Sequence, residues 1–348
     1  MRGTGCGIDV WVPGLEVREE WMSGLKSPVA TAALVVGVMF AATAPQAFAQ
    51  ADYPKQPIKI VVGFTPGGSN DLLARLVAQK FGERMGQPAV VENKPGAGAL
   101  IGTEFVARAT PDGYTLLMAP AGTLVINPAV YSKLPYDSIK SFAHIAVVAT
   151  YPFLLSVNAG GPIKTVKDLI AFAKANPDKA NYASTSTVFQ LTSELFNSKA
   201  GVKFEHIPFK SGGEIVTAIL SGQVTTAFAD AGPALPQIKS GKLLALATSG
   251  AKRFAELPEL PTMKEAGIDG VEVDGFSGLV APAGTPAAII KKLEAEVNAI
   301  IKLDDFQARL KQIGLVPGGG TGEEFAAMVA RDIPKWTAVA KAANIKLD

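Results

Sequence analysis

The residues best suited to chemistry lie in six short loops, each of which follows a hydrophobic run. The loops read FTPGGSND at 64–71, NKPGAGALIG at 93–102, APAGTLVIN at 119–127, STST at 184–187, FKSGG at 209–213 and ADAGP at 229–233. Glycines let the backbone approach a ligand closely, and hydroxyls and amides donate hydrogen bonds. Loops of this composition favour binding of a small anion by uncharged dipoles.

The first loop has the strongest case for anion binding. Gly67 and Gly68 permit close approach, and Ser69 or Asn70 is expected to cap the helix that follows. The backbone N–H groups of a first helical turn attract an anion. Asp71 would repel an anion, so we expect it to point aside. The alternative interpretation of this loop is a simple capped turn.

Three later loops supply candidates in the second half of the chain. Ser184, Thr185, Ser186 and Thr187 offer four hydroxyls, which either donate to carboxylate oxygens or cap a helix. Lys210 is a candidate positive charge near the ligand, and its alternative is an ordinary solvated lysine. Asp230 follows another strand and is also a candidate. The six loops divide into three from each half of the chain, which suggests two opposed walls.

An enzyme, a metal site and a cofactor are not expected. The two histidines, His144 and His206, lie in or near strands and lack partners at metal-ligand spacing, so each is interpreted as a packed or edge residue. The loop 93–102 resembles a dinucleotide fingerprint but fails it, because Gly102 stands four residues after Gly98 instead of three. No basic run indicates a nucleic-acid partner.

Alternation of short β-branched runs with helical patterns predicts an α/β fold with parallel sheets. Two extended stretches, 145–157 with Pro152 inside it and 273–281, are expected to cross between two lobes. Residues 50–150 with 276–348 would form the first lobe, and residues 151–275 the second. Strands are expected at 58–63, 89–92, 115–118, 179–183, 203–208, 225–229 and 243–248, and helices at 71–85, 166–175, 191–200, 213–221, 286–301, 304–313 and 323–341, with a further helix opening after the 93–102 loop.

The N-terminal segment has the features of a secretory signal. Lys26 precedes an apolar run, and Ala47-Phe48-Ala49 is a small-x-small cleavage pattern, so residues 1–49 are expected to be removed on export. Translation is expected to begin at Met22. The alternative, a membrane anchor, is disfavoured because the run is shorter than the roughly 20 residues that a span needs. The only cysteine, Cys6, lies in this segment, and the net charge of +2 identifies no charged partner.

Several segments in order resemble the Bug family, the extracytoplasmic solute receptors of tripartite tricarboxylate transporters. They are FTPGGSNDLLAR at 64–75, NKPGAGALIG at 93–102, PDGYTLL at 111–117, NPAVY at 127–131, IPFKS at 207–211, RFAELPELPTMKEAG at 253–267, APAGTP at 281–286 and KWTAVAKAANI at 335–345. The resemblance spans the chain from Tyr53 to Asp348.

The resemblance implies a type II periplasmic-binding-protein fold, with two α/β lobes, a two-strand hinge and a ligand cleft between the lobes. It implies a periplasmic monomer that captures a small carboxylate (a di- or tricarboxylate, an amino acid or an aromatic acid) and delivers it to membrane permease subunits. A periplasmic sensor module that feeds a two-component system is the alternative. The family's ligand-binding positions carry over to Phe64, Pro66, Gly67, Gly68, Ser69, Asp71, Gly122, Thr123 and Asn127.

One segment departs from the family pattern. The family has a glycine-bearing run before a His-Leu pair, whereas this chain reads STSTVFQL at 184–191, with Gln190 in the histidine position. The second-lobe anchor is therefore expected to differ in shape. Phe189 in this segment suggests an apolar or aromatic acid as ligand.

Overall fold

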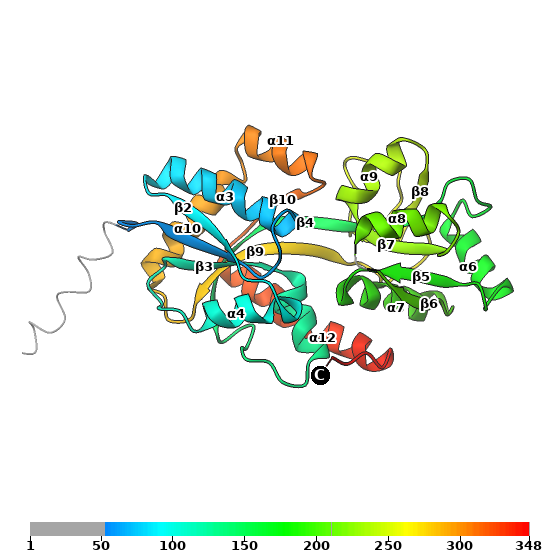
Figure 1. The fold of residues 1–348 in the computed structure, drawn as a ribbon, viewed down its shortest axis with the longest axis horizontal. Coiled ribbons are helices and arrows are strands. Elements are labelled where there is room, and N and C mark those ends of the chain that lie inside the picture. Colours follow the sequence, from blue (N-terminus) through cyan, green and yellow to red (C-terminus); the bar gives the residue numbers. More distant parts are fainter. Residues whose placement is uncertain (1–52, 210, 348) are drawn as a thin grey trace, which may run out of the picture. The chain divides into compact units, whose positions relative to one another are not determined.

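One long strand runs through both lobes of the fold, and a second strand lies antiparallel to its first part. The computed structural model describes residues 53–209 and 211–347, and the chain from Pro54 onward forms one compact unit. Strand β4 (Phe142–Asn158) lies beside β9 (Asp274–Pro282) along its first part, up to the pairing of Pro152 with Asp274. From Phe153 onward, β4 pairs with strands of the second lobe (Figure 1). These two strands are therefore the predicted crossings.

The first lobe is built on the strand order β2-β1-β3-β9-β4, with β10 also paired to β4. Strand β1 places Ile58, Ile60, Val61 and Val62 fully in the core, as expected for a parallel strand covered on both faces. Helices α3 and α10 contact one side of the sheet, and α4 and α12 lie on the other (Figure 1). The elements are β1 (Ile58–Val62), α3 (Ser69–Met85), β2 (Ala89–Asn93), η2 (Ala97–Ala99), α4 (Leu100–Ala107), β3 (Thr115–Pro120), η3 (Gly122–Ile126), α5 (Asn127–Val130), α10 (Ala287–Ile300), α11 (Asp304–Gln312), β10 (Val316–Gly319) and α12 (Gly322–Ala342).

The second lobe continues the same sheet in the order β4-β7-β5-β6, and β8 also pairs with β4. Strands β5, β6 and β7 are parallel to one another, so their carboxyl ends share one edge. Because β7 is antiparallel to β4 and its last residue, Asp230, pairs with Phe153, that edge faces the crossing. The elements are α6 (Val166–Ala175), β5 (Asn181–Ser184), α7 (Thr187–Ala200), β6 (Glu205–Pro208), α8 (Gly212–Leu220), β7 (Thr226–Asp230), α9 (Ala231–Lys239) and β8 (Leu243–Thr248).

The structure confirms the α/β fold and corrects several local predictions. The sheet is mixed rather than parallel, because β4, β8, β9 and β10 run antiparallel to their neighbours. Helix α9 and strand β10 were not predicted. Helix α7 begins at Thr187, four residues earlier than expected. Neither Ser69 nor Asn70 caps α3, because the helix already includes both residues and its N-cap is Gly68.

The predicted signal segment 1–49 and the start at Met22 lie outside the described residues, so they remain predictions. Within 53–209 and 211–347, no helix is long and apolar enough to cross a membrane.

Close packing between two glycines positions the loop that follows β2. A Cβ atom on Gly102 of α4 would stand 3.0 Å from the Cα of Gly63 and 3.0 Å from the backbone oxygen of Lys94. Both neighbours are backbone atoms, which cannot move aside as a flexible side chain can. In contrast, a Cβ on Gly82 of α3 would have only the oxygen of Gln87 in reach, at 4.0 Å.

We therefore expect Gly102→Ala to lower the free energy of unfolding by about 1–3 kcal/mol, the usual cost of overpacking. Gly82→Ala is the matched control and should raise it by about 0.5–1 kcal/mol, because alanine is the better helix former. Urea denaturation followed by circular dichroism measures both. Equal effects of the two substitutions would contradict the packing at Gly102.

Candidate functional site

The loop after β1 presents open backbone at the start of α3. Gly67 has a φ of 90°, in the region that favours glycine. Gly68 is the N-cap of α3, and among the described residues no side chain caps this helix. A Cβ on either glycine would meet no described atom within 4 Å. Phe64, Pro66 and Ser69 are exposed in the same loop. The first amides of α3 are therefore accessible to an anion.

Asp71 points away from this open face, as the sequence predicts. It is 2% exposed and accepts hydrogen bonds from the backbone N of Gly67 at 2.9 Å, from Asn93 Nδ2 at 2.9 Å, and from Arg75 Nε and Nη2, each at 3.0 Å. Burial acts to raise the pKa of Asp71, but these hydrogen bonds and the charge of Arg75 outweigh it and hold the pKa below its usual value of 3.8. Asp71 thus holds the turn at Gly67 and forms an ion pair with Arg75.

Asn70 joins this loop to both neighbouring strands. Its Nδ2 donates to the backbone oxygen of Met118 in β3 at 3.0 Å, and its Oδ1 accepts from Ser277 Oγ in β9 at 2.8 Å. Sequence reasoning treated Asn70 only as a cap and did not select Ser277. The signal for Asn70 was its place beside two glycines at a strand end, whereas nothing in the sequence connects it with Ser277, 207 residues away.

Of the third-loop candidates, Thr123 and Asn127 are buried beneath the loops rather than open to the surface. Asn127 Nδ2 donates to the backbone oxygen of Gly98 at 3.1 Å and to the hydroxyl of Tyr136 at 3.2 Å. Thr123 is 1% exposed, and its hydroxyl has no hydrogen-bond partner within the described chain. Gly122, partly buried, begins the turn η3 and has open space around a Cβ. Asn127 therefore supports the neighbouring loop.

On the second lobe, the hydroxyl run 184–187 leads into α7. Ser184 Oγ is within 2.7 Å of His206 Nε2 on β6, so this hydroxyl is engaged away from the helix start. Ser186 is the N-cap of α7, yet no capping hydrogen bond forms there among the described residues. In contrast, Thr165 caps α6 and Thr321 caps α12 through their side chains. Ser186 is exposed and Thr185 and Thr187 are partly exposed, so three of the four hydroxyls remain accessible.

Three aromatic rings connect α7 to the crossing. Phe189 in the first turn of α7 packs edge-on against Phe153 of β4, with ring centroids 4.7 Å apart. Tyr151 is two residues before Phe153 on the same face of β4, at 6.0 Å. The Tyr151 ring covers Gly275 of β9, where a Cβ would clash with it. The crossing is thus apolar next to the hydroxyl run.

Asp230 ends β7 and is the N-cap of α9, but in the described chain it makes no capping bond. Its Oδ1 is fully buried, and no described group hydrogen-bonds to it. Burial raises the pKa of Asp230 to about 6. Burial and then the charge of Asp230 raise the pKa of Tyr151, so the two groups lie close together. The structure therefore brings Asp230, Tyr151 and the α7 start to one end of the crossing.

The remaining candidate, Lys210, lies outside the described residues, and the two histidines are a packed residue and a sheet-edge residue. The predicted role of Lys210 is therefore untested. His144 is packed edge-on against Phe325, with ring centroids 5.0 Å apart, and burial lowers its pKa to about 4. His206 is on the sheet-edge strand β6. Within the described residues, no group of three His, Cys, Asp or Glu side chains could hold a metal ion.

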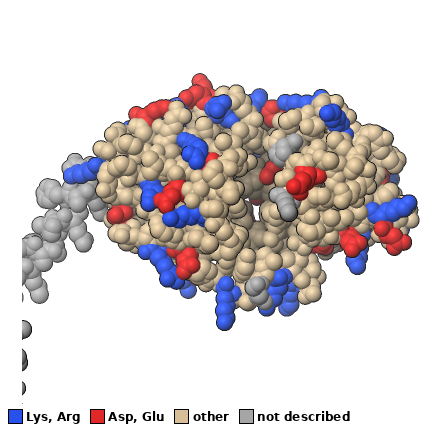
Figure 2. Space-filling model, viewed as in Figure 1, with Lys and Arg blue, Asp and Glu red and all other residues tan. Residues whose placement is uncertain are grey.

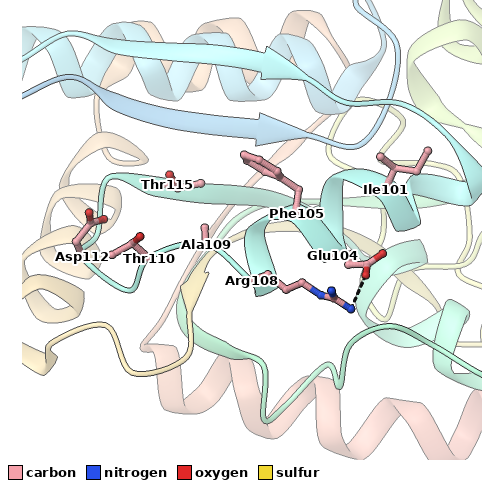
Figure 3. Close-up of a pocket in the computed structure, with 8 residues that line it drawn as sticks. All are labelled: Ile101, Glu104, Phe105, Arg108, Ala109, Thr110, Asp112 and Thr115. Carbon is pink, nitrogen blue, oxygen red and sulfur yellow. Dashed lines mark ion pairs between the residues drawn. The ribbon is translucent and has the colours of Figure 1, made fainter. Parts of the chain in front are cut away.

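The surface is hollowed between the two lobes (Figure 2). A separate pocket lies on the outer side of α4, where Glu104 and Arg108 form an ion pair at 2.7 Å (Figure 3). It contains none of the predicted ligand-binding residues. Its lining is Ile101, Glu104, Phe105, Arg108, Ala109, Thr110, Asp112 and Thr115.

Comparison with known proteins identifies the family. Residues 73–345 match the model of the tripartite tricarboxylate transporter family receptor. The chain belongs to this family. The receptor is 31% identical over 317 residues to Protein BugT of Bordetella pertussis, covering 90% of this chain and 97% of BugT. The resemblance to Bug proteins is therefore confirmed, and so is the role of the family, periplasmic solute binding.

Solved structures of relatives share the receptor's fold. R. palustris Rpa4515 with adipate has a TM-score of 0.75 and 33% identity, and the match covers 84% of this chain and 99% of Rpa4515. MatC from Rhodopseudomonas palustris with bound malate has a TM-score of 0.72 and 30% identity, with coverage of 82% and 99%. The two-lobed periplasmic-binding-protein fold is thus established for the receptor.

The contacts of Asp71 predict a large loss of stability on its removal. Asp71→Ala should lower the free energy of unfolding at pH 7 by about 2–4 kcal/mol, because several charge-assisted hydrogen bonds are lost. The pKa of Asp71 is lowered in the folded state. Its contribution is therefore complete near neutral pH and disappears as the pH falls through that lowered pKa.

Glu104→Ala is the control for this prediction, because it breaks the exposed pair with Arg108. This change should cost less than about 1 kcal/mol. Urea denaturation at pH 7 and at successively lower pH compares the two variants. Equal losses, or a difference that persists in acid, would contradict the role of Asp71.

Proposed function

We propose that this receptor captures a small dicarboxylate in the periplasm. The observation that carries the proposal is the uncapped start of α3 behind the open Gly67-Gly68 loop, in a chain of this family. A helix N-terminus with accessible N–H groups binds carboxylates through hydrogen bonds and the helix dipole. The adipate and malate present in two solved relatives support a dicarboxylate as the ligand class.

In this proposal each lobe binds part of the ligand. The amides of Gly67, Gly68 and Ser69 bind one carboxylate, with Phe64 and Pro66 beside them. The hydroxyls of Thr185, Ser186 and Thr187 and the first amides of α7 bind the other end. Each favourable helix terminus contributes about 0.3–2 kcal/mol.

Closure of the lobes completes the site in this proposal. Residues 50–150 with 276–348 form one lobe and residues 151–275 the other, and the chain passes between them at Pro152–Phe153 and at Asp274. Strand β4 pairs with β9 up to Pro152 and with β7 from Phe153 onward, and this change of partner supports a hinge there. The ligand binds to the first lobe, and the second lobe then closes over it.

Export and delivery complete the proposed role. Cleavage after Ala49 releases a monomer into the periplasm, and the closed, loaded form docks on membrane permease subunits. Capture of the co-encoded permease by immobilised receptor in the presence of ligand, but not in its absence, tests this step. The family match, to transporter receptors, supports transport, and no observation favours the alternative role as a sensor module.

A thermal-shift screen tests the ligand class. The panel contains malate, succinate, adipate, citrate, aspartate and nicotinate, and calorimetry then measures the affinity for each compound that shifts the melting temperature. We expect the dicarboxylates to raise the melting temperature most, because binding to the native state alone stabilises it. A shift with nicotinate alone would contradict the dicarboxylate proposal, and no shift with any compound would contradict carboxylate capture.

Substitution of Gly68 tests the α3 site directly. Gly68 has a φ of −76°, so leucine is tolerated there without backbone strain, and its side chain would project into the open space above the amides. We expect Gly68→Leu to weaken ligand binding at least about thirtyfold, which corresponds to about 2 kcal/mol.

The matched control is Gln79→Leu, on the exposed surface of the same helix, eleven residues after Gly68. This variant should bind like the wild type. Calorimetry measures the affinities, and circular dichroism checks that both variants fold. Wild-type affinity in Gly68→Leu would show that the ligand is bound elsewhere.

A further inference from the structure

One carboxylate oxygen of the partly exposed Asp230, Oδ1, is an unpartnered buried acceptor at the end of the crossing. Oδ1 is inaccessible to solvent, and within the described chain nothing donates a hydrogen bond to it. Aspartate is a preferred N-cap residue, yet this one makes no capping bond to α9. A buried carboxylate without a donor is costly when ionised. A structural role as a cap therefore does not explain Asp230.

The environment of Asp230 contains no compensating charge among the described residues. Burial is the one cause that raises its pKa to about 6. The charge of Asp230 contributes to the raised pKa of Tyr151 on β4, and Ser277 of β9 hydrogen-bonds to the Tyr151 hydroxyl. The titratable groups on the other elements packed against β7 and α9 are engaged elsewhere or contribute nothing to this shift: Glu194 of α7, Glu214 of α8, Lys239 of α9 and Lys311 of α11.

The position of Asp230 also places it near the proposed ligand. Asp230 pairs with Phe153, whose ring contacts Phe189 in the first turn of α7. Ala149, four residues before Phe153, pairs with Ser277, which donates to Asn70 at the start of α3. Four residues of a strand span roughly 13 Å. Asp230 and the α3 loop therefore lie near opposite ends of a space that a short dicarboxylate could bridge.

We propose that Asp230 is protonated in the ligand-bound receptor and donates a hydrogen bond from its carboxyl group to one carboxylate of the dicarboxylate. This inference rests on the proposed function. Two ionised carboxylates at this distance repel each other, whereas a carboxylic acid and a carboxylate share a strong hydrogen bond. The proton comes from solvent, so each ligand that binds above the pKa of free Asp230 takes up one proton.

The direction in which ligand affinity changes with pH follows from comparing Asp230 in the free and the ligand-bound receptor. Free Asp230 has a pKa of about 6, and a bound anion raises that pKa further. Below about pH 6 the Asp230 proton is already present, so Asp230 no longer makes the affinity depend on pH. Above that pH, binding must take up a proton, and the affinity falls by up to about tenfold per pH unit. The ligand remains a dianion over this range, so its own titration does not interfere.

Calorimetry with malate or adipate measures directly how many protons are taken up when the ligand binds. Titrations at pH 7.5 in two buffers with different heats of ionisation report the number of protons bound with the ligand. We expect about one proton per ligand for the wild type, and a dissociation constant roughly tenfold larger at pH 7.5 than at pH 6. Absence of proton uptake in a receptor that binds either dicarboxylate would overturn the proposal.

The variant Asp230→Asn tests whether the ligand needs a hydrogen-bond donor or a negative charge at position 230. Asparagine has the same size and keeps a donor, so the variant should bind without proton uptake and with one affinity from pH 6 to 8. Glu104→Gln is the control, because Glu104 is an acidic residue outside the proposed site and the hinge, in an exposed pair with Arg108. This control should retain the pH dependence and the proton uptake of the wild type.

Two outcomes distinguish this inference from the proposed function. A folded Asp230→Asn variant that no longer binds would show that the ligand needs the ionised carboxylate at this position, because asparagine keeps both a donor and an acceptor, and the inference fails while carboxylate capture stands. A wild-type receptor that binds neither dicarboxylate at pH 6 or 7.5 overturns both. Thermal unfolding checks the fold: Asp230→Asn should be more stable than wild type at pH 8 and equal to it at pH 4, because the cost of a buried charge is absent in acid.

Discussion

The antiparallel pairing of β4 with β9 is the constraint on which the site depends. On the first-lobe side, β9 carries Ser277, which is bonded to Asn70 at the start of α3. On the second-lobe side, the same β4 pairs with β7 and so places Asp230 beside Phe153. The two binding walls therefore take their spacing from one continuous strand. Backbone hydrogen bonds fix the register of such a pairing, and a slip of one residue would turn every side chain to the opposite face.

The proposed site would hold an anion without a cation from the described residues. Arg75 of α3 is bound to Asp71, which also accepts a hydrogen bond from the backbone N–H of Gly67, so this ion pair shapes the loop. Backbone amides and hydroxyls then remain as the donors. Dipoles of this kind are less costly to desolvate than a full charge, so a receptor that uses them can bind and release its ligand as the lobes close and open. A protonated Asp230 would likewise act as an uncharged hydrogen-bond donor to the anion.

Parts of the fold were predictable because local patterns sufficed. Helix α6 and strand β8 have the predicted bounds, since hydrophobic periodicity and a capping box define α6 without help from distant residues. Helix α9 was not predicted because Pro236 lies within it. Proline is disfavoured inside helices, so the local sequence pattern does not indicate one there. The predicted caps of α3 failed for a different reason. The chain turns at Gly67, which Asp71 holds from inside the helix, so the helix starts earlier than a cap pattern indicates.

The sequence by itself determined the family, the two crossings and the loops at the strand ends, because ordered motifs and hydrophobic runs are local properties of the chain. It also determined that Asp71 points aside, since an acid next to open amides would oppose an anion. Only the tertiary structure decided that Asn70 is bonded to Ser277, that Ser184 is engaged by His206 and that Asp230 Oδ1 is buried without a donor among the described residues. Those properties depend on which strands are neighbours and on which atoms exclude water, and both arise only when distant segments pack together.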